Sequence, residues 1–309
     1  LGTMAHCLVE GFGEGASGIN YFLKDTCKGK ITEEEFKSAY ENATDYIVDV
    51  KTYDGFNKTK LFSLPVKLSK KQIRNTWLST YTRFFNYNWS TWFSTALIAY
   101  WFFIFIVAGL INLARFIAPG LVQSFTGKTT NLFRKYITLA PTGRQHHIER
   151  KRIWGIIEVC VPTRLELIIV FGWFILALVF NIVHIDHVSQ NTVWKSKMAE
   201  MGRKVSDRSG IMATFLIPIQ ILFAGRNNFL QWVSGFSYLR MIVFHRWVSR
   251  IVFALVIMHT VAMSASGVAL GKFVTRNKKA YVQWGYVATV GGLIMLVTAA
   301  AQFRRTNYE

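Results

Sequence analysis

The chain is poor in cysteine, proline and acidic residues. It has three cysteines, five prolines and 17 acidic residues, against 36 basic ones, in 309 residues. Cys7 and Cys27 could pair within a polar N-terminal segment, with Cys160 left over, but two cysteines are too few for a disulfide-built fold. No glycine-rich phosphate loop, internal repeat or low-complexity tract is present, so these residues carry no nucleotide-binding motif.

Apolar residues dominate what remains. Hydrophobic residues make up 51% of the chain and aromatic residues 15%, which, with so little proline, is typical of a polytopic helical membrane protein. Five apolar runs are candidates for membrane spans: 91–117, 165–183, 210–224, 239–264 and 285–301. The third run is the shortest and contains Pro218. We therefore predict an all-α polytopic membrane protein, a helical bundle of about five spans with a small N-terminal domain.

The formal net charge is +19, but the basic residues lie between the apolar runs, so they indicate topology and not nucleic acid binding. The most basic loop separates the first two runs, and the positive-inside rule places it in the cytoplasm. The predicted domains are an extracellular segment 1–89, a first span 90–117, a basic cytoplasmic loop 118–160 and the remaining spans in 161–309. Alternation then places 266–282 outside, although four basic residues there run against the rule: Lys272, Arg276, Lys278 and Lys279.

The predicted extracellular segment carries glycosylation sequons at Asn42, Asn57 and Asn88, which agrees with a secretory-pathway domain. Asn88 adjoins the first span, where a glycan would crowd the lipid headgroups. The chain begins at Leu1 without a signal-peptide pattern, so we expect a removed leader or an incomplete N-terminus. Thr32 to Glu35 has the pattern of a helix capping box, and Ser69 is placed to begin a helix that runs towards the first span.

His245 and His259 are fourteen residues apart in one apolar run. Fourteen helical residues rise about 21 Å and return to within roughly 40° of the same face. Neutral imidazole is a common axial ligand of haem iron, so the pair predicts two redox centres, one above the other, across a membrane. The alternative is that each imidazole only hydrogen-bonds to a neighbouring helix. If the pair does ligate two metal centres, the second ligand of each centre must come from elsewhere.

Three arginines flank His245 on the predicted cytoplasmic side: Arg240, Arg246 and Arg250. Such residues commonly extend towards the lipid headgroups, but a guanidinium also binds carboxylates in a bidentate manner, and haem propionates would be suitable partners. We predict Arg246 and Arg250 as the best candidates. At the outer end of the second run, His184, Asp186 and His187 form a short cluster that either captures a metal ion or is a solvated helix end.

Several motifs make the chain similar to the fungal ferric reductases, membrane flavocytochromes related to NADPH oxidases. The resemblance runs from about Asn42 to the end of the chain. Its most specific parts are Gly225-Arg-Asn-Asn-Phe229 and Phe244-His-Arg-Trp-Val-Ser-Arg250 with His259, and it also includes Pro162-Thr-Arg-Leu-Glu166 and Asp207-Arg-Ser-Gly210.

The resemblance implies that 161–309 is part of a six-helix haem domain preceded by one extra N-terminal span. His245 would ligate the iron of an inner haem b and His259 that of an outer haem b. The second ligands, two further spans and the FAD- and NADPH-binding domains would follow Glu309, so we expect the chain to be part of a longer protein.

The implied activity is that of a flavocytochrome ferric-chelate reductase serving iron uptake. Electrons would pass from cytoplasmic NADPH through FAD and two haems to extracellular ferric or cupric chelates. The expected location is the plasma membrane, or the vacuolar membrane, among lipids and iron-uptake partner proteins. Two alternatives stay open: an NADPH oxidase producing superoxide, which the long N-terminal segment and extra span disfavour, and a non-redox transporter or assembly subunit.

Overall fold

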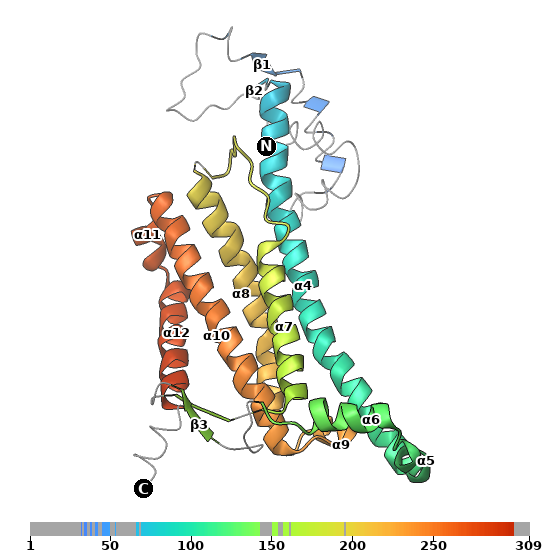
Figure 1. The fold of residues 1–309 in the computed structure, drawn as a ribbon. Coiled ribbons are helices and arrows are strands. Elements are labelled where there is room, and N and C mark those ends of the chain that lie inside the picture. Colours follow the sequence, from blue (N-terminus) through green and yellow to red (C-terminus); the bar gives the residue numbers. More distant parts are fainter. Residues whose placement is uncertain are drawn as a thin grey trace. The chain divides into compact units, whose positions relative to one another are not determined.

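The structure is a computed structural model. It describes residues 32, 34, 35, 38, 41, 42, 45–49, 53, 66, 67, 69–142, 150–153, 157–160, 162–194 and 196–299. Five helices in this part of the chain are long and apolar enough to cross a membrane: α4 (Lys70–Ile117), α7 (Arg164–Ile182), α8 (Lys197–Ala224), α10 (Tyr238–Ala269) and α12 (Ala280–Thr298). The predicted fold class, an all-α polytopic membrane protein, and the five spans are confirmed (Figure 1).

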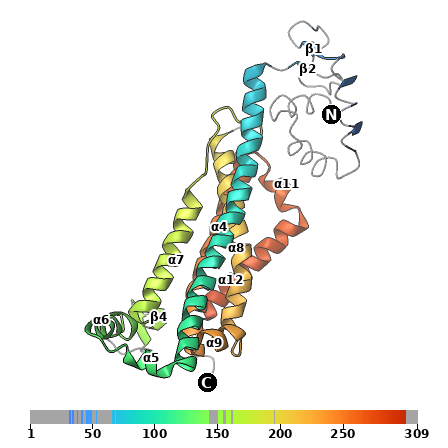
Figure 2. The ribbon, with the colours of Figure 1, turned by 90° about the vertical axis from the view of Figure 1, so that its right-hand side faces the viewer.

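Short elements connect the long helices. They are α5 (Pro119–Ser124), α6 (Lys128–Phe133), a π-helical turn η1 (Arg134–Thr138), α9 (Phe229–Ser234) and α11 (Phe273–Asn277). Strands β3 (Arg150–Ile153) and β4 (Ile157–Cys160) form an antiparallel pair within the predicted basic loop, with Arg150 opposite Cys160. Helices α5, α6 and α9 lie at the same end of the long helices (Figures 1 and 2).

Two of the spanning helices begin well before their apolar runs. Helix α4 begins at Lys70 because Ser69 caps it, as expected: the Ser69 hydroxyl accepts a hydrogen bond from the Gln72 amide at 3.3 Å. Helix α8 begins at Lys197, where the Ser196 hydroxyl accepts from the Ala199 amide at 3.1 Å. The early turns of both helices carry buried polar side chains, so hydropathy alone places the starts too late.

The described residues fall into two compact units. The first comprises residues up to Phe85 together with Asp186–Glu200. It contains a parallel pair of two-residue strands, β1 (Val48–Asp49) and β2 (Val66–Lys67). The predicted capping box is confirmed, since the Thr32 amide donates to Glu35 Oε2 at 2.8 Å and the Glu35 amide donates to Thr32 Oγ1 at 3.3 Å. Hydrogen bonds from the Thr32 backbone and side chain lower the pKa of Glu35.

In the same unit, the segment 186–200 packs on the first turns of α4. Asn75 donates to the Gln190 side chain at 2.8 Å, and the Thr192 amide donates to the Ser79 hydroxyl at 3.1 Å. These contacts explain why polar residues in the first turns of α4 are buried.

The second unit comprises Asn86–Ile185 and the chain from Met201 onward. Its core lies around Trp101 of α4, which is 1% exposed and packs on Trp173 of α7, Phe223 of α8 and Phe244 of α10 with ring centroids 5.0–5.7 Å apart. The α4 residues in this core follow a four-residue spacing: Phe93, Leu97, Trp101 and Phe105. Such a stripe is the face that one helix buries against its neighbours.

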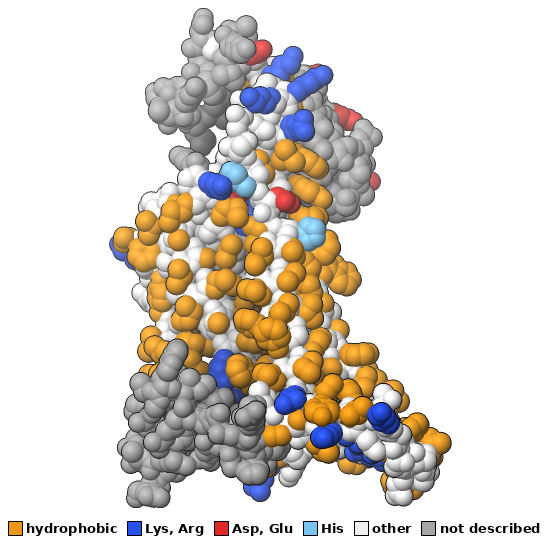
Figure 3. Space-filling view, viewed as in Figure 1, with side chains coloured by type: hydrophobic (Ala, Val, Ile, Leu, Met, Phe, Trp, Pro, Cys, Tyr) orange, Lys and Arg blue, Asp and Glu red, His pale blue; other side chains and the backbone are white. Residues whose placement is uncertain are grey.

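Most of the remaining helix surface is apolar. Helix α12 has no buried residue, and Tyr281, Trp284 and Met295 are each about 70% exposed. Apolar side chains gather over the long helices (Figure 3). An apolar surface this extensive suits lipid or further protein and not water.

Candidate haem-ligand pair on helix α10

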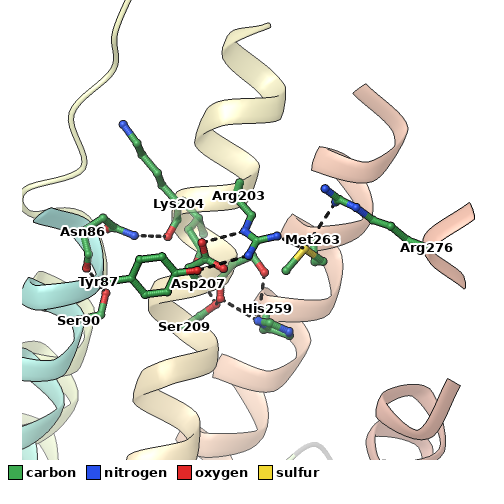
Figure 4. A network of polar contacts seen from close by, with 12 residues as sticks. Asn86, Tyr87, Ser90, Arg203, Lys204, Asp207, Ser209, His259, Met263 and Arg276 are labelled. Atoms are coloured by element: carbon green, nitrogen blue, oxygen red, sulfur yellow. Dashed lines mark hydrogen bonds and ion pairs between the residues drawn. The ribbon is translucent and has the colours of Figure 1, made fainter. Parts of the chain in front are cut away.

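Helix α10 carries both predicted ligands. It begins at Tyr238 with Ser237 as its cap and, at 32 residues, is long enough to cross a bilayer. His245 and His259 are both half-buried. Their rings turn towards α8, which runs beside α10 in the opposite direction (Figures 1 and 4).

Each ring forms the same hydrogen bond to α8. His245 Nδ1 lies 2.8 Å from the carbonyl oxygen of Gln220, and His259 Nδ1 lies 2.8 Å from that of Ser206. The two carbonyls are also fourteen residues apart, as the antiparallel arrangement requires (220 − 206 = 259 − 245 = 14). A carbonyl can only accept, so Nδ1 carries the proton in the neutral ring and Nε2 carries the lone pair.

The other ring nitrogen of each histidine, Nε2, could bind a metal. His245 Nε2 has one long contact, 3.4 Å to the Ser249 hydroxyl, and His259 Nε2 has no hydrogen bond partner in the described part of the chain. A histidine that donates one ring nitrogen to a backbone carbonyl is oriented to ligate through the other. In the neutral form, the two rings therefore have the tautomer and the orientation that would suit axial ligation of haem iron.

Small residues on α8 allow α8 and α10 to lie close together. A Cβ added to Gly210 would lie 2.5 Å from His259 Nδ1, and one added to Gly202 would lie 2.9 Å from the Ala262 carbonyl oxygen. Gly202, Ser206 and Gly210 form a small-residue stripe at a four-residue spacing, the pattern that lets membrane helices approach closely.

A polar network lies one turn beyond His259 (Figure 4). Arg203 donates from Nε to Asp207 at 2.8 Å, from Nη2 to the Tyr87 hydroxyl at 3.4 Å and from Nη1 to the Met263 sulfur at 3.9 Å. Arg276 of α11 also donates to the Met263 sulfur, at 3.8 Å. The network therefore joins α4, α8, α10 and α11.

Arg208 has a different role. Its guanidinium is buried and donates to the carbonyls at the end of α7: Phe180 at 3.0 Å, His184 at 3.1 Å, and Val183. It also donates to Asn86 Oδ1 at 2.8 Å. A cation at a helix C-terminus satisfies carbonyls that lack partners in the helix, so Arg208 caps α7.

The three flanking arginines differ in their contacts. Arg240 Nε donates to Glu166 at 2.8 Å, and Glu166 closes a capping box with Thr163 at the start of α7, so this arginine joins two helix ends. The Arg250 guanidinium lies 4.9 Å above the ring of Trp247. Arg246 is half-buried on the same helix as His245.

The other predicted positions are dispersed. The His184 ring stacks on Trp89 at 4.5 Å, whereas His187 Nδ1 lies 2.6 Å from a Glu200 oxygen. Among the described residues no group of three or more metal-binding side chains occurs. Asn42 and Asn88 are exposed, and Asn57, Cys7 and Cys27 lie outside the described residues.

Sequence reasoning did not predict roles for Arg203, Arg208 or Gly210. One signal was present, because charged residues within a spanning helix are expected to have specific partners. Asp207-Arg-Ser-Gly210 entered the resemblance as a motif, without a role for its members.

Comparison with known proteins shows which family this chain resembles. The family described as ferric reductase like transmembrane component matches residues 209–309. Ferric/cupric reductase transmembrane component 1 of Candida albicans is 40% identical over 72% of this chain and 30% of its own length. Ferric reductase transmembrane component 4 of Saccharomyces cerevisiae is 30% identical over 90% of this chain and 38% of its own length.

No solved structure gives a significant match. The chain spans 30% to 44% of the length of five curated relatives that it matches, so it corresponds to one portion of such proteins. Within that portion the match extends across the polar N-terminal segment as well as the spans. The chain belongs to the family of fungal ferric reductase transmembrane components.

Proposed function

We propose that this chain holds two haem b groups on His245 and His259 and forms part of the electron path of a ferric-chelate reductase. In the full-length protein, electrons would pass from cytoplasmic NADPH through FAD and the haems to extracellular ferric or cupric chelates, for iron uptake at the plasma or vacuolar membrane. The names of the relatives, ferric and ferric/cupric reductase components, support the reaction class. FAD and NADPH would bind outside this chain.

The observation that carries the proposal is the matched pair of Nδ1 hydrogen bonds to α8. If the histidines had only a packing role, any polar contact would satisfy their ring nitrogens. Here both rings use the same nitrogen, on the same kind of acceptor, at positions nearly four turns apart on both helices. This repetition supports two equivalent ligand sites, separated by about 21 Å along α10.

The protein groups orient the ligands and exclude water. The carbonyls of Gln220 and Ser206 hold the rings in the tautomer that exposes the Nε2 lone pair, and they raise its basicity. Apolar packing around Phe244 and Val248 keeps water from the inner position. When bound by two histidines, a haem supplies a one-electron couple without an open coordination position.

Arg246 and Arg250 are proposed to pair with the propionates of the inner haem. Both lie within about one and a half turns of His245. The ring of Trp247 supports the Arg250 guanidinium from one side, which leaves its planar edge for a carboxylate.

The test uses the full-length protein, purified from membranes, with haem content measured per chain. His245→Ala and His259→Ala should each remove roughly half of the haem, because each deletes one of two ligand sites. Ferric-chelate reduction should fall to background in both variants. His184→Asn is the matched control, because it removes an imidazole outside the pair and asparagine tolerates the left-handed backbone there (φ 56°).

Two results would contradict the proposal. Unchanged haem content in both variants would leave the histidines as packing residues. A haem-dependent activity that yields superoxide, sensitive to superoxide dismutase and without ferric reduction, would identify an oxidase instead.

A further inference from the structure

The connection between α10 and α12 is strongly basic, although it is predicted to lie outside the cell. It carries Lys272, Arg276, Lys278 and Lys279, and no acidic residue occurs between Asp207 and Glu309. The topology predicted from the basic loop 118–160 places this connection outside, where the positive-inside rule disfavours lysine and arginine. The topology rule therefore does not account for these charges.

Two guanidinium groups converge at this end of α10. Arg203 of α8 and Arg276 of α11 both donate to the sulfur of Met263, at 3.9 and 3.8 Å (Figure 4). A thioether is a weak acceptor and carries no charge. Asp207 neutralises Arg203 alone, so one positive charge of the pair is uncompensated by a carboxylate among the described residues.

Arg203 and Arg276 are accessible from the surface and are well placed to bind a ligand. Arg203 has 25% of its side chain exposed, and Arg276 is half-buried, so both reach the surface with several donors available. Met263 follows His259 by one helical turn, and Asp207 follows the Ser206 carbonyl that holds the His259 ring. The basic pair therefore lies next to the outer of the two proposed haem ligands.

We propose that Arg203 and Arg276 bind the carboxylates of an anionic polycarboxylate metal chelate, with the neighbouring lysines attracting it from solution. A guanidinium matches a carboxylate with two parallel hydrogen bonds, and the pair could replace its weak sulfur contacts with these. A free ferric or cupric cation would be repelled by the same surface. The inference rests on the proposed function and specifies its substrate class.

The first experiment uses unaltered full-length protein in nanodiscs of phosphatidylcholine, which has no net charge. The KM for iron(III)–EDTA, an anionic chelate, should rise with ionic strength while kcat changes little, because salt screens the attraction. Hexaammineruthenium(III), a cationic acceptor, should show the opposite trend. A KM for iron(III)–EDTA that is insensitive to salt would overturn the proposal without the need for any variant.

The second experiment reverses one charge. Arg276→Glu should raise the KM for iron(III)–EDTA about tenfold and leave that for hexaammineruthenium(III) unchanged or lower, since steering of this kind changes association by about that factor. Arg276→Lys keeps the charge but loses the two parallel hydrogen bonds, so its KM for iron(III)–EDTA should rise by less than that of Arg276→Glu. Lys128→Glu is the matched control, because Lys128 is an exposed residue of α6 at the opposite end of the long helices.

The outcomes separate this inference from the proposed function. Haem content and the rate of hexaammineruthenium(III) reduction report on the electron path. If Arg276→Glu keeps both and also keeps the KM for iron(III)–EDTA, the chelate site is overturned and the electron path is not. Loss of haem in Arg276→Glu would assign the guanidinium to a propionate. A KM effect that appears only when anionic lipid is added would assign the surface to lipid headgroups.

Discussion

At the scale of single residues, the orientation of two imidazoles depends on atoms that belong to other residues. His259 is held by the backbone of Ser206, and the approach is open because Gly210 has no side chain. A histidine in a membrane helix has many ways to satisfy its polar atoms, and only some leave Nε2 available. The small residues of α8 favour the arrangement in which Nδ1 of the ring contacts the backbone carbonyl and Nε2 stays available.

Gly210→Ala tests this dependence. The added methyl group would lie 2.5 Å from His259 Nδ1, so the ring has to move away from the Ser206 carbonyl. We expect weaker binding of the outer haem, by about tenfold or more, as for other groups that orient a metal ligand. Haem titration of the full-length protein measures this.

Gly285→Ala in α12 is the matched control, because nothing lies within 4 Å of the added methyl group. Equal haem affinity in the two variants would show that the Ser206 contact does not position His259.

At the scale of the helix, α8 organises the second unit. It supplies both carbonyls to α10 and, through Arg208, closes the end of α7. Arg208 is fully buried, has an aromatic ring of Phe93 at 5.3 Å, and satisfies carbonyls that α7 cannot satisfy itself. A buried charge of this kind is tolerated because the surrounding acceptors replace its hydration.

Arg208→Met should destabilise the second unit. Methionine keeps much of the volume but leaves the Phe180 and His184 carbonyls without their donor, a loss of about 3 kcal/mol. The expected result is a lower thermal midpoint for the detergent-purified protein. Lys128→Met, a change at an exposed position, should leave the midpoint unchanged. A midpoint for Arg208→Met equal to that of the control would rule out the capping role.

At the scale of the whole molecule, the spans are incomplete as an electron path. In the proposed function each histidine would supply one axial ligand, whereas haem electron carriers of this kind use two. The exposed apolar surface of α12 and the length of the relatives both agree with further protein packing on these helices. The topology of the spans would decide which of the two proposed haem sites lies towards the cytoplasm.

Glycan mapping tests that topology. If the N-terminal segment is extracellular, Asn42→Gln and Asn57→Gln should each remove one endoglycosidase-sensitive band shift. Asn88→Gln should change nothing, because Asn88 lies within α4 close to the predicted membrane surface. Unglycosylated protein from a secretory host would contradict the predicted orientation. Modification at Asn88 would agree with that orientation but would place Asn88 clear of the membrane surface.

The fold class was predictable from sequence because membrane spans obey a local rule: apolar runs of sufficient length must form helices in lipid. The five spans, the Ser69 start of α4 and the Thr32 capping box all follow from residues close together in the chain. The start of α8 at Lys197 was not predicted, because buried polar residues lower the hydropathy of its first turns.

The sequence by itself determined that His245 and His259 share one face of a helix, because their spacing is nearly four whole turns. The tertiary structure decided which atoms of those rings are engaged, because the acceptors, Gln220 and Ser206, lie on another helix. It also brought Arg203 and Arg276, 73 residues apart (276 − 203 = 73), to one sulfur atom. Contacts between distant residues depend on how helices pack, and helix packing is set by many side chains together.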